Sequence, residues 1–305
     1  MLFLLLGRWI HIYSSSLLFS LIVFNCLYVI PVLGRNDGLC ALAKNQAPLI
    51  WICWLAMVLS GVLWLLSVVA SISGSEIEFT IVRQVVAVTQ FGHLWLFRSI
   101  LWLGLGGVLL FDALSKRSLV YSNFVCIGLA TLNVVSLVFA GHAAATASRL
   151  AGLHLLIDAS HLFVSAVWPN GLVPLAVWLF VMKRAQGYEV LPAIHNVLER
   201  FSAISLIAVA VLAATGVSNS VLMLKRVNDL YATTYGQILV LKILIFAVMI
   251  GLGARNRQLL KVRQESESYT DNDAKQLFSN ICVESALAFI VFGLVGLLGA
   301  VPPPD

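Results

Sequence analysis

The sequence contains very little charge. Only 11% of its 305 residues are Asp, Glu, Lys or Arg, whereas 60% are hydrophobic and the mean hydropathy is +0.97. A soluble domain carries about 25% charged residues, so this composition excludes a soluble protein. The repeated apolar runs of about 20 residues are typical of membrane helices. The surplus of 19 basic over 14 acidic residues fits cytoplasmic loops, and we expect no nucleic-acid partner.

The sequence also lacks the signatures of common catalytic and cofactor sites. It contains no P-loop, GxSxG, HExxH or CxxCH, so nothing supports a hydrolase or an ATP-driven pump, and we expect no enzyme. The five cysteines include no CxxC, which disfavours a disulfide framework or a zinc site. The apolar residues 1–10 lack a basic n-region and are expected to lead into the first span.

Hydropathy predicts an all-α, polytopic membrane protein with about eight transmembrane helices. A short interfacial helix is expected within 76–90, ahead of the third span. The fifth span is long, contains Pro169 and Pro174, and is expected to bend or break near Trp168–Gly171. The predicted spans cover residues 8–33, 49–72, 91–114, 119–141, 150–182, 200–223, 235–256 and 280–301.

The distribution of basic residues predicts the orientation. The odd-numbered connections between spans hold twelve Lys and Arg, and the N-terminus and even-numbered connections hold five. Basic residues accumulate on the cytoplasmic side. We therefore expect a protein surrounded by lipid, with both termini on the outer, non-cytoplasmic side of the membrane.

Shared sequence features indicate an internal repeat. A Thr-x-x-Gly sequence opens the third span at Thr89 and the seventh at Thr233, and a basic residue follows each glycine by six positions, as Arg98 and Lys242. The second and sixth spans share a hydroxyl-Gly-Val triplet, Ser60-Gly61-Val62 and Thr215-Gly216-Val217. These features predict two parallel four-helix halves, 1–141 and 142–305.

The fifth span holds the strongest functional signal. His154, Asp158 and His161 are the only ionisable residues in the apolar run 150–182, and their spacing places them on one stripe of a helix. Ionisable groups at membrane depth are costly and mark functional sites. The alternative interpretation is a polar network between helices that binds nothing. In the predicted repeat, His11 of the first span corresponds to His154.

Helix geometry limits how this stripe can bind an ion. His154 and His161 lie about 10 Å apart along a helix, whereas metal–nitrogen bonds are about 2 Å long. One ion therefore binds either His154 with Asp158 or Asp158 with His161, which suits a relay. Further ligands are expected from other helices, in the first place His142 and His93, and Asn219 is a further candidate site residue. Imidazole and carboxylate ligands suit copper, zinc, iron or nickel alike.

From about Gly141 to Leu260 the sequence resembles the copper resistance protein D family of bacterial inner membranes. The matching landmarks include Gly141-His142-Ala143, His154, His161, Trp168, Gly171-Leu172, Arg200-Phe201-Ser202, Thr215-Gly216-Val217, Thr234-Tyr235-Gly236, Lys242 and Asn256. The resemblance implies copper uptake through the inner membrane alongside periplasmic copper-binding proteins, and it supports His142, His154 and His161 as copper ligands. Asn170 departs from the glycine that the family usually has there, which puts the local backbone in doubt.

Our leading hypothesis is a copper relay. Copper, in either oxidation state, would pass from His93 and His142 to His154 and Asp158, then to His161, and be released inward. Candidate ligands in the inner half are three cysteines, Cys53, Cys126 and Cys282. The alternatives are a membrane redox protein that binds b-type haem, and a metal-binding sensor or assembly partner without transport. Energy coupling and oligomeric state stay open.

Overall fold

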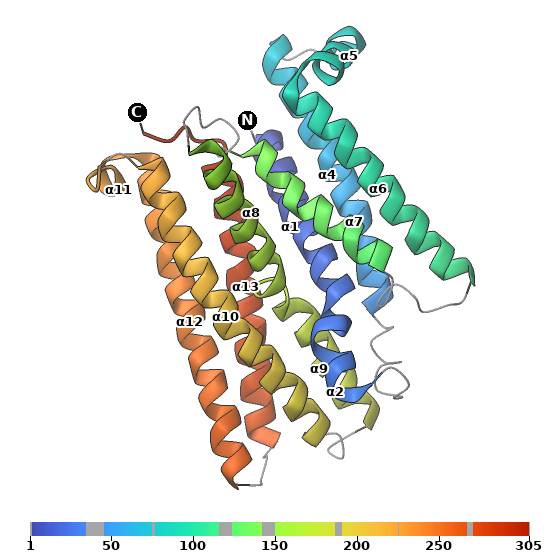
Figure 1. Cartoon of the computed structure of the whole chain (residues 1–305), viewed down its shortest axis with the longest axis vertical. Helices are drawn as coiled ribbons and strands as arrows, with labels where there is room; N and C mark the ends of the chain where they lie inside the picture. Colours follow the sequence, from blue (N-terminus) through green and yellow to red (C-terminus); the bar gives the residue numbers. More distant parts are fainter. Residues whose placement is uncertain are drawn as a thin grey trace.

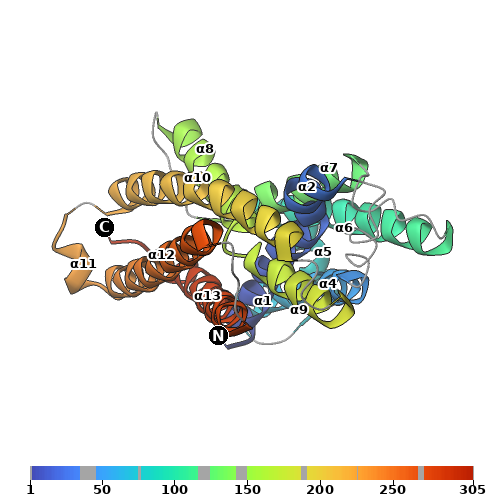
Figure 2. The same ribbon diagram turned by 90° about the horizontal axis from the view of Figure 1, so that it is seen from below.

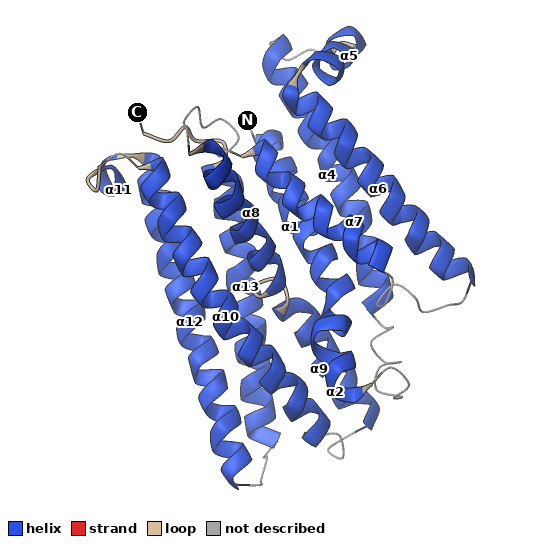
Figure 3. Cartoon of the chain, viewed as in Figure 1, coloured by secondary structure: helices blue, strands red, loops and turns tan. Residues whose placement is uncertain are grey.

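The structure, a computed structural model, describes residues 2–34, 46–74, 77–115, 124–141, 150–186, 191–224, 226–266 and 271–304. All regular structure in these residues is helical, as the sequence predicts (Figure 3). The elements are α1 (Leu2–Phe24), η1 (Asn25–Val29), α2 (Ile30–Leu33), α4 (Ala47–Ser73), α5 (Phe79–Val88), α6 (Gln90–Ser115), α7 (Phe124–Val135), η4 (Ser136–Ala140), α8 (Ala151–Val167), α9 (Leu172–Gln186), α10 (Leu191–Met223), α11 (Asp229–Ala232), α12 (Thr234–Ser266) and α13 (Asp271–Leu298).

Seven helical segments of the described chain are long and apolar enough to cross a membrane. Of the fourth predicted span, 119–141, the described residues Phe124–Ala140 are helical and end in a 3-10 turn, and residues 119–123 lie outside the described residues. Large apolar side chains such as Leu103, which is 72% exposed on α6, cover the outer surface of the bundle. A lipid bilayer is the environment that such a surface requires.

Each half of the chain forms a ring of four packed helices. In the first half α1 packs on α4, α4 on α6, α6 on α7, and α7 on α1. In the second half α8 packs on α10, α10 on α12, α12 on α13, and α13 on α9. The two rings lie side by side and meet where α1 contacts α8 and α13 (Figures 1 and 2). This shared connectivity is what a four-plus-four repeat requires, and the repeat itself stays a prediction.

The fifth span is interrupted where the sequence predicts a break. α8 ends at Val167 and α9 begins at Leu172. Hydroxyl groups of the first span donate hydrogen bonds to carbonyls that the break leaves without helical partners. The Ser20 hydroxyl donates to the Ala166 carbonyl, and the Tyr28 hydroxyl donates to the Val167 carbonyl at 3.4 Å. α1 continues into the π-helix η1, which contains Tyr28. Irregular backbone at membrane depth is tolerated where protein covers it.

The short helix predicted within 76–90 is present as α5, and the second half has a short counterpart in α11. Both lie at the end of the bundle where the two chain termini lie (Figure 1). The Thr89 hydroxyl oxygen accepts the Gly92 N–H at 2.9 Å, and that of Thr233 accepts the Gly236 N–H at 3.0 Å. In both elbows a Cβ on the glycine would collide with a carbonyl of the preceding short helix. The Thr-x-x-Gly sequence therefore builds the same sharp elbow twice.

Candidate metal-binding site

The predicted stripe lies on a regular helix. α8 runs without interruption through His154, Asp158 and His161, and it packs against α10 of the same half. His154 is buried, at 2% exposure, and the other two side chains are partly buried. The stripe therefore faces protein for most of its surface. An ionisable group buried in a membrane helix is costly unless it has polar or charged partners.

His161 is held by one ring nitrogen. Its Nδ1 lies 2.9 Å from the hydroxyl oxygen of Thr215 on α10, and that hydroxyl donates its own hydrogen to the Val211 carbonyl at 2.6 Å. Because the hydroxyl hydrogen is committed, Nδ1 carries the ring hydrogen and donates it to Thr215. Nε2 then presents a lone pair, and no described residue forms a hydrogen bond with it. A histidine oriented by a bond at one nitrogen is the usual arrangement for metal ligation at the other.

Asp158 is positioned by two further elements. Asn219 on α10, a candidate site residue from the sequence, donates from its amide nitrogen to Asp158 Oδ1 at 3.1 Å. The backbone of Gly141 passes the other carboxylate oxygen: a Cβ built there would lie 3.6 Å from Oδ2. His142 follows Gly141 directly but lies outside the described residues.

A cation accompanies this cluster. Lys242 on α12 interacts electrostatically with both Asp158 and His161. It is the residue that the predicted repeat pairs with Arg98. The second half thus brings together a carboxylate, an imidazole and an ammonium group from α8 and α12, supported by polar side chains of α10.

The described residues do not form a complete metal centre. No three His, Cys, Asp or Glu side chains among them lie close enough to hold one ion. This agrees with the expectation from helix geometry that His154 and His161 do not share an ion. Completing either half-site requires a ligand from outside the described chain, such as His142, or from the ion's own water shell.

The structure does not bring His93 to the stripe. Its exposed ring lies in the α5–α6 elbow, where Nε2 donates to the Ala87 carbonyl at 2.8 Å. In the other elbow Gln237 donates to the Tyr231 carbonyl at 3.0 Å, over the same separation of six residues. The Gln237 amide thus makes in the second half the same hydrogen bond to a backbone carbonyl that the His93 imidazole makes in the first. This hydrogen bond gives His93 a role in holding the elbow, and its role in capturing copper stays a prediction.

The first half contains a second buried histidine site. His11 is 1% exposed, and its Nδ1 donates to the Met57 carbonyl at 2.8 Å. Its Nε2 accepts a hydrogen bond of 2.7 Å from Arg98. The same guanidinium donates to the Asn133 carbonyl at 2.6 Å and to the Ser136 hydroxyl at 2.5 Å. Both nitrogens of this ring are therefore used within the protein.

The two histidine sites correspond more closely than the sequence indicated. A Cβ on Gly61 would lie 3.1 Å from His11 Cε1, and a Cβ on Gly216 would lie 3.5 Å from His161 Cε1. These contacts pair His11 with His161, whereas the span positions predicted from the sequence pair it with His154. The difference arises because depth along a helix is judged from span boundaries, which sequence gives only to within several residues.

Sequence reasoning missed one buried carboxylate. Glu284 on α13 is 1% exposed and lies within the eighth predicted span. It accepts a hydrogen bond of 2.6 Å from Asn256 on α12. The rule that singled out Asp158, an ionisable residue inside an apolar run, applies to Glu284 and could have found it. By contrast, Cys53 and Cys126 lie in the apolar core of the first half, and Cys282 is exposed.

Comparison with known proteins gives two family matches. Residues 1–152 match the N-terminal domain of copper resistance protein D-like proteins, and residues 195–298 match copper resistance protein D. Together the two segments cover most of the chain. The stripe on α8 falls between them, so the matches bear on the metal that the protein handles and not on these particular residues.

Individual relatives agree with this result. The chain is 28% identical to inner membrane protein YebZ of Escherichia coli K12 over 220 residues, which cover 72% of this chain and 71% of that protein. It is 25% identical to copper resistance protein D of Pseudomonas syringae pv. tomato over 225 residues, with the same coverage.

A third relative is larger. Copper transport protein CutJ of Bacillus subtilis is 29% identical over 189 residues, which cover 59% of this chain and 33% of that protein. No solved structure matches the chain. From the two family matches and the all-helical membrane fold, the chain belongs to the copper resistance protein D family.

Proposed function

We propose that the protein takes copper from the periplasmic side and moves it into or across the membrane through the cluster on α8, α10 and α12. The family supplies the metal, because relatives are named for copper resistance and copper transport. The observation that carries the proposal is the state of His161: Nδ1 is anchored to Thr215, and Nε2 accepts no hydrogen bond from the described residues. The ring is thereby oriented to bind an ion.

Each residue of the cluster has a distinct role in the proposed relay. His142, next to Gly141, and His154 receive copper near the end of α8 that the charge distribution assigns to the periplasm. Asp158, held by Asn219, supplies the negative charge that a copper ion needs in a medium of low dielectric constant. His161 receives the ion deeper in the membrane. A periplasmic copper-binding protein is the proposed donor.

Lys242 makes the cluster stable when no copper is present. An ionised carboxylate at membrane depth is costly unless a positive charge is close, and Lys242 supplies that charge to Asp158. An arriving copper ion competes for the same carboxylate. The Lys242 ammonium group thus neutralises Asp158 when copper is absent. When copper is bound, the repulsion between the ammonium group and the copper ion favours release of the ion over permanent binding.

Haem binding receives less support from the same geometry. A b-type haem needs two histidines with free ring nitrogens on facing helices. Of the buried histidines, His11 has both ring nitrogens engaged, one by Met57 and one by Arg98. The visible spectrum of the purified protein tests this alternative, since a reducible Soret band would favour haem.

Copper accumulation in cells tests the proposed function. Cells that express His161→Ala or Asp158→Asn are expected to accumulate copper no better than cells without the protein, and the purified variants to retain less copper. His195→Gln serves as the matched control, because His195 lies on the predicted cytoplasmic side and pairs with Glu199. Wild-type copper content in both stripe variants, with normal yield and thermal unfolding, would rule the relay out.

A further inference from the structure

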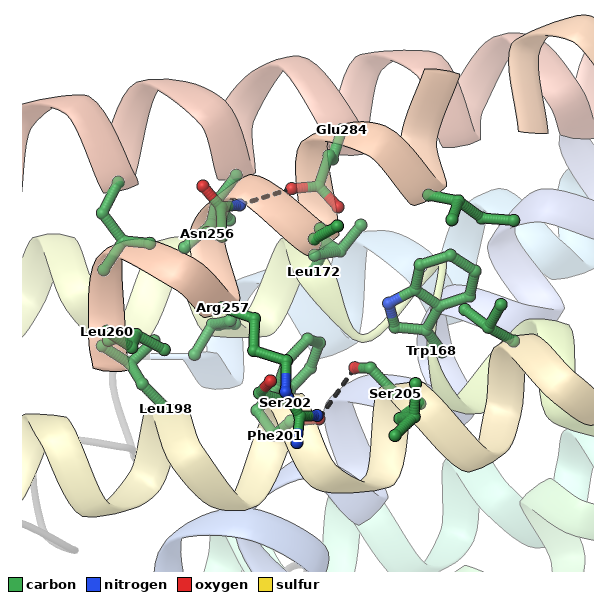
Figure 4. Close-up of a pocket in the computed structure, with 18 residues that line it drawn as sticks. Trp168, Leu172, Leu198, Phe201, Ser202, Ser205, Asn256, Arg257, Leu260 and Glu284 are labelled. Atoms are coloured by element: carbon green, nitrogen blue, oxygen red, sulfur yellow. Dashed lines mark hydrogen bonds between the residues drawn. The ribbon is translucent and has the colours of Figure 1, made fainter. Parts of the chain in front are cut away.

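A cavity begins where the stripe ends. It has a volume of about 170 Å³ and is lined by residues of α9, α10, α12 and α13, together with Trp168, the first residue after α8 (Figure 4). Trp168 follows His161 by seven residues, about 10 Å along a helix. The other lining residues, such as Leu198 and Leu277, belong to the half of each helix that the charge distribution assigns to the cytoplasmic side. The cavity therefore continues the line of the relay inward.

One carboxylate is built into the wall of this cavity. Glu284 is 1% exposed and accepts the hydrogen bond of 2.6 Å from Asn256, whose own amide oxygen accepts 2.7 Å from Asn280. These partners are neutral amides, and no described cation lies within 4.0 Å of the carboxylate. Burial of an unpaired negative charge at membrane depth is strongly unfavourable. The carboxyl group therefore keeps its proton until a cation enters the cavity.

The other groups around Glu284 leave room for such a cation. The flanking residue on α12 is Gly253, where a Cβ would lie 3.6 Å from Glu284 Oε2, so no side chain occupies the space beside that oxygen. Arg257 is the one other ionisable residue among the lining side chains. It extends toward Ser202 on α10, away from Glu284 (Figure 4). Its Nη1 is buried without a hydrogen-bond partner in the described chain.

We propose that this cavity is the inner copper-binding site of the pathway, with Glu284 as its anionic ligand. The proposal rests on the proposed function, because it takes its cargo from His161. As the copper–oxygen bond forms, the carboxyl O–H bond breaks and the proton passes to water, with no change in oxidation state. Oxygen ligands favour the divalent over the monovalent ion. A single carboxylate binds weakly, as a site next to the exit must if the ion is to leave.

Cu(II) electron paramagnetic resonance separates the two sites. The wild-type protein loaded with a Cu(II) salt is expected to show one component with nitrogen hyperfine splitting, from His161, and a second component with oxygen ligands alone. Glu284→Gln, which keeps the hydrogen bond with Asn256 but removes the charge, should lose only the second component. In vesicles containing this variant, copper should bind but not reach the lumen.

The controls make the outcome decisive for this site. Glu199→Gln removes an exposed carboxylate on α10 and should behave as wild type. Should Glu284→Gln fail to fold, Gly253→Val fills the space beside Oε2 while retaining the carboxylate, and it should also lose the second component. Wild-type spectra and transport in a folded Glu284 or Gly253 variant would overturn the inner site alone, whereas failure of His161→Ala to change copper binding would overturn the proposed function.

Discussion

Each half of the molecule contains a histidine that is anchored through Nδ1, but the two histidines differ in the partner of Nε2. His11 and His161 both donate from Nδ1, one to the Met57 carbonyl and one to the Thr215 hydroxyl. They differ at Nε2, which in His11 accepts a hydrogen bond from Arg98 and in His161 accepts none from the described chain. The comparison teaches that two buried histidines anchored at Nδ1 can differ in whether Nε2 remains available to an ion.

The basic residue on the third helix of each half explains the difference. The Arg98 guanidinium is planar and carries five N–H donors, and it bonds His11, Asn133 and Ser136 at once. An ammonium group such as that of Lys242 is a compact charge without this fork. Arg98 therefore closes the first site as a structural network, and Lys242 leaves the second site open while still compensating Asp158.

The largest effect is expected from removing Arg98. Arg98→Met should destabilise the protein by about 3 to 5 kcal/mol, because several buried polar groups lose a charged partner at once. Thermal unfolding of the purified protein in detergent measures this loss. Lys242→Met is the matched change in the other half and should destabilise the copper-free protein less than Arg98→Met does, because only Asp158 loses its cation. Equal unfolding temperatures for the two variants would contradict the division into a structural and a functional half.

How far sequence alone reaches is visible in these same residues. Span positions and the break at Trp168–Gly171 follow from hydropathy and proline, which act locally, whereas the Thr-x-x-Gly sequences indicate a repeat and not the elbows that they build. The bond between Arg98 and His11 could not be predicted, because it joins residues 87 positions apart through side-chain rotamers on different helices. Glu284 was overlooked for a different reason: it is the only Asp, Glu, Lys, Arg or His in the predicted span 280–301, so no second charged or histidine residue shares its helix face.

Converting the second site into the first should remove copper from His161 without unfolding the protein. In Lys242→Arg a guanidinium can donate to His161 Nε2, as Arg98 does to His11, and it occupies the lone pair that copper needs. Metal analysis of the purified variant should show a clear loss of copper at an unchanged unfolding temperature. Lys261→Arg, an exposed exchange of the same kind on the same helix, is the control and should retain copper.

A smaller effect is expected when only the anchor of His161 is altered. Thr215→Val removes the acceptor of the Nδ1 hydrogen, so the ring is no longer held in one tautomer and orientation. Loss of such an outer hydrogen bond typically weakens metal affinity by about 10- to 100-fold. Thr215→Ser restores the hydroxyl that Ser60 provides at the corresponding place in the first half and should bind copper as wild type. A valine variant with unchanged affinity in a copper titration would show that this bond does not orient a ligand.

The smallest effect is expected at His93, where the two halves can be compared most directly. His93→Gln places in the first elbow the side chain that the second elbow already uses, since Gln237 donates to a carbonyl six residues earlier just as His93 does. Copper accumulation and thermal unfolding should both match wild type. His93→Ala should lower the free energy of unfolding by about 1 kcal/mol, the contribution of one hydrogen bond, again without loss of copper. If the glutamine variant instead lost copper accumulation while folding normally, His93 would be a ligand that captures copper at the surface, and the first half would contribute directly to the pathway.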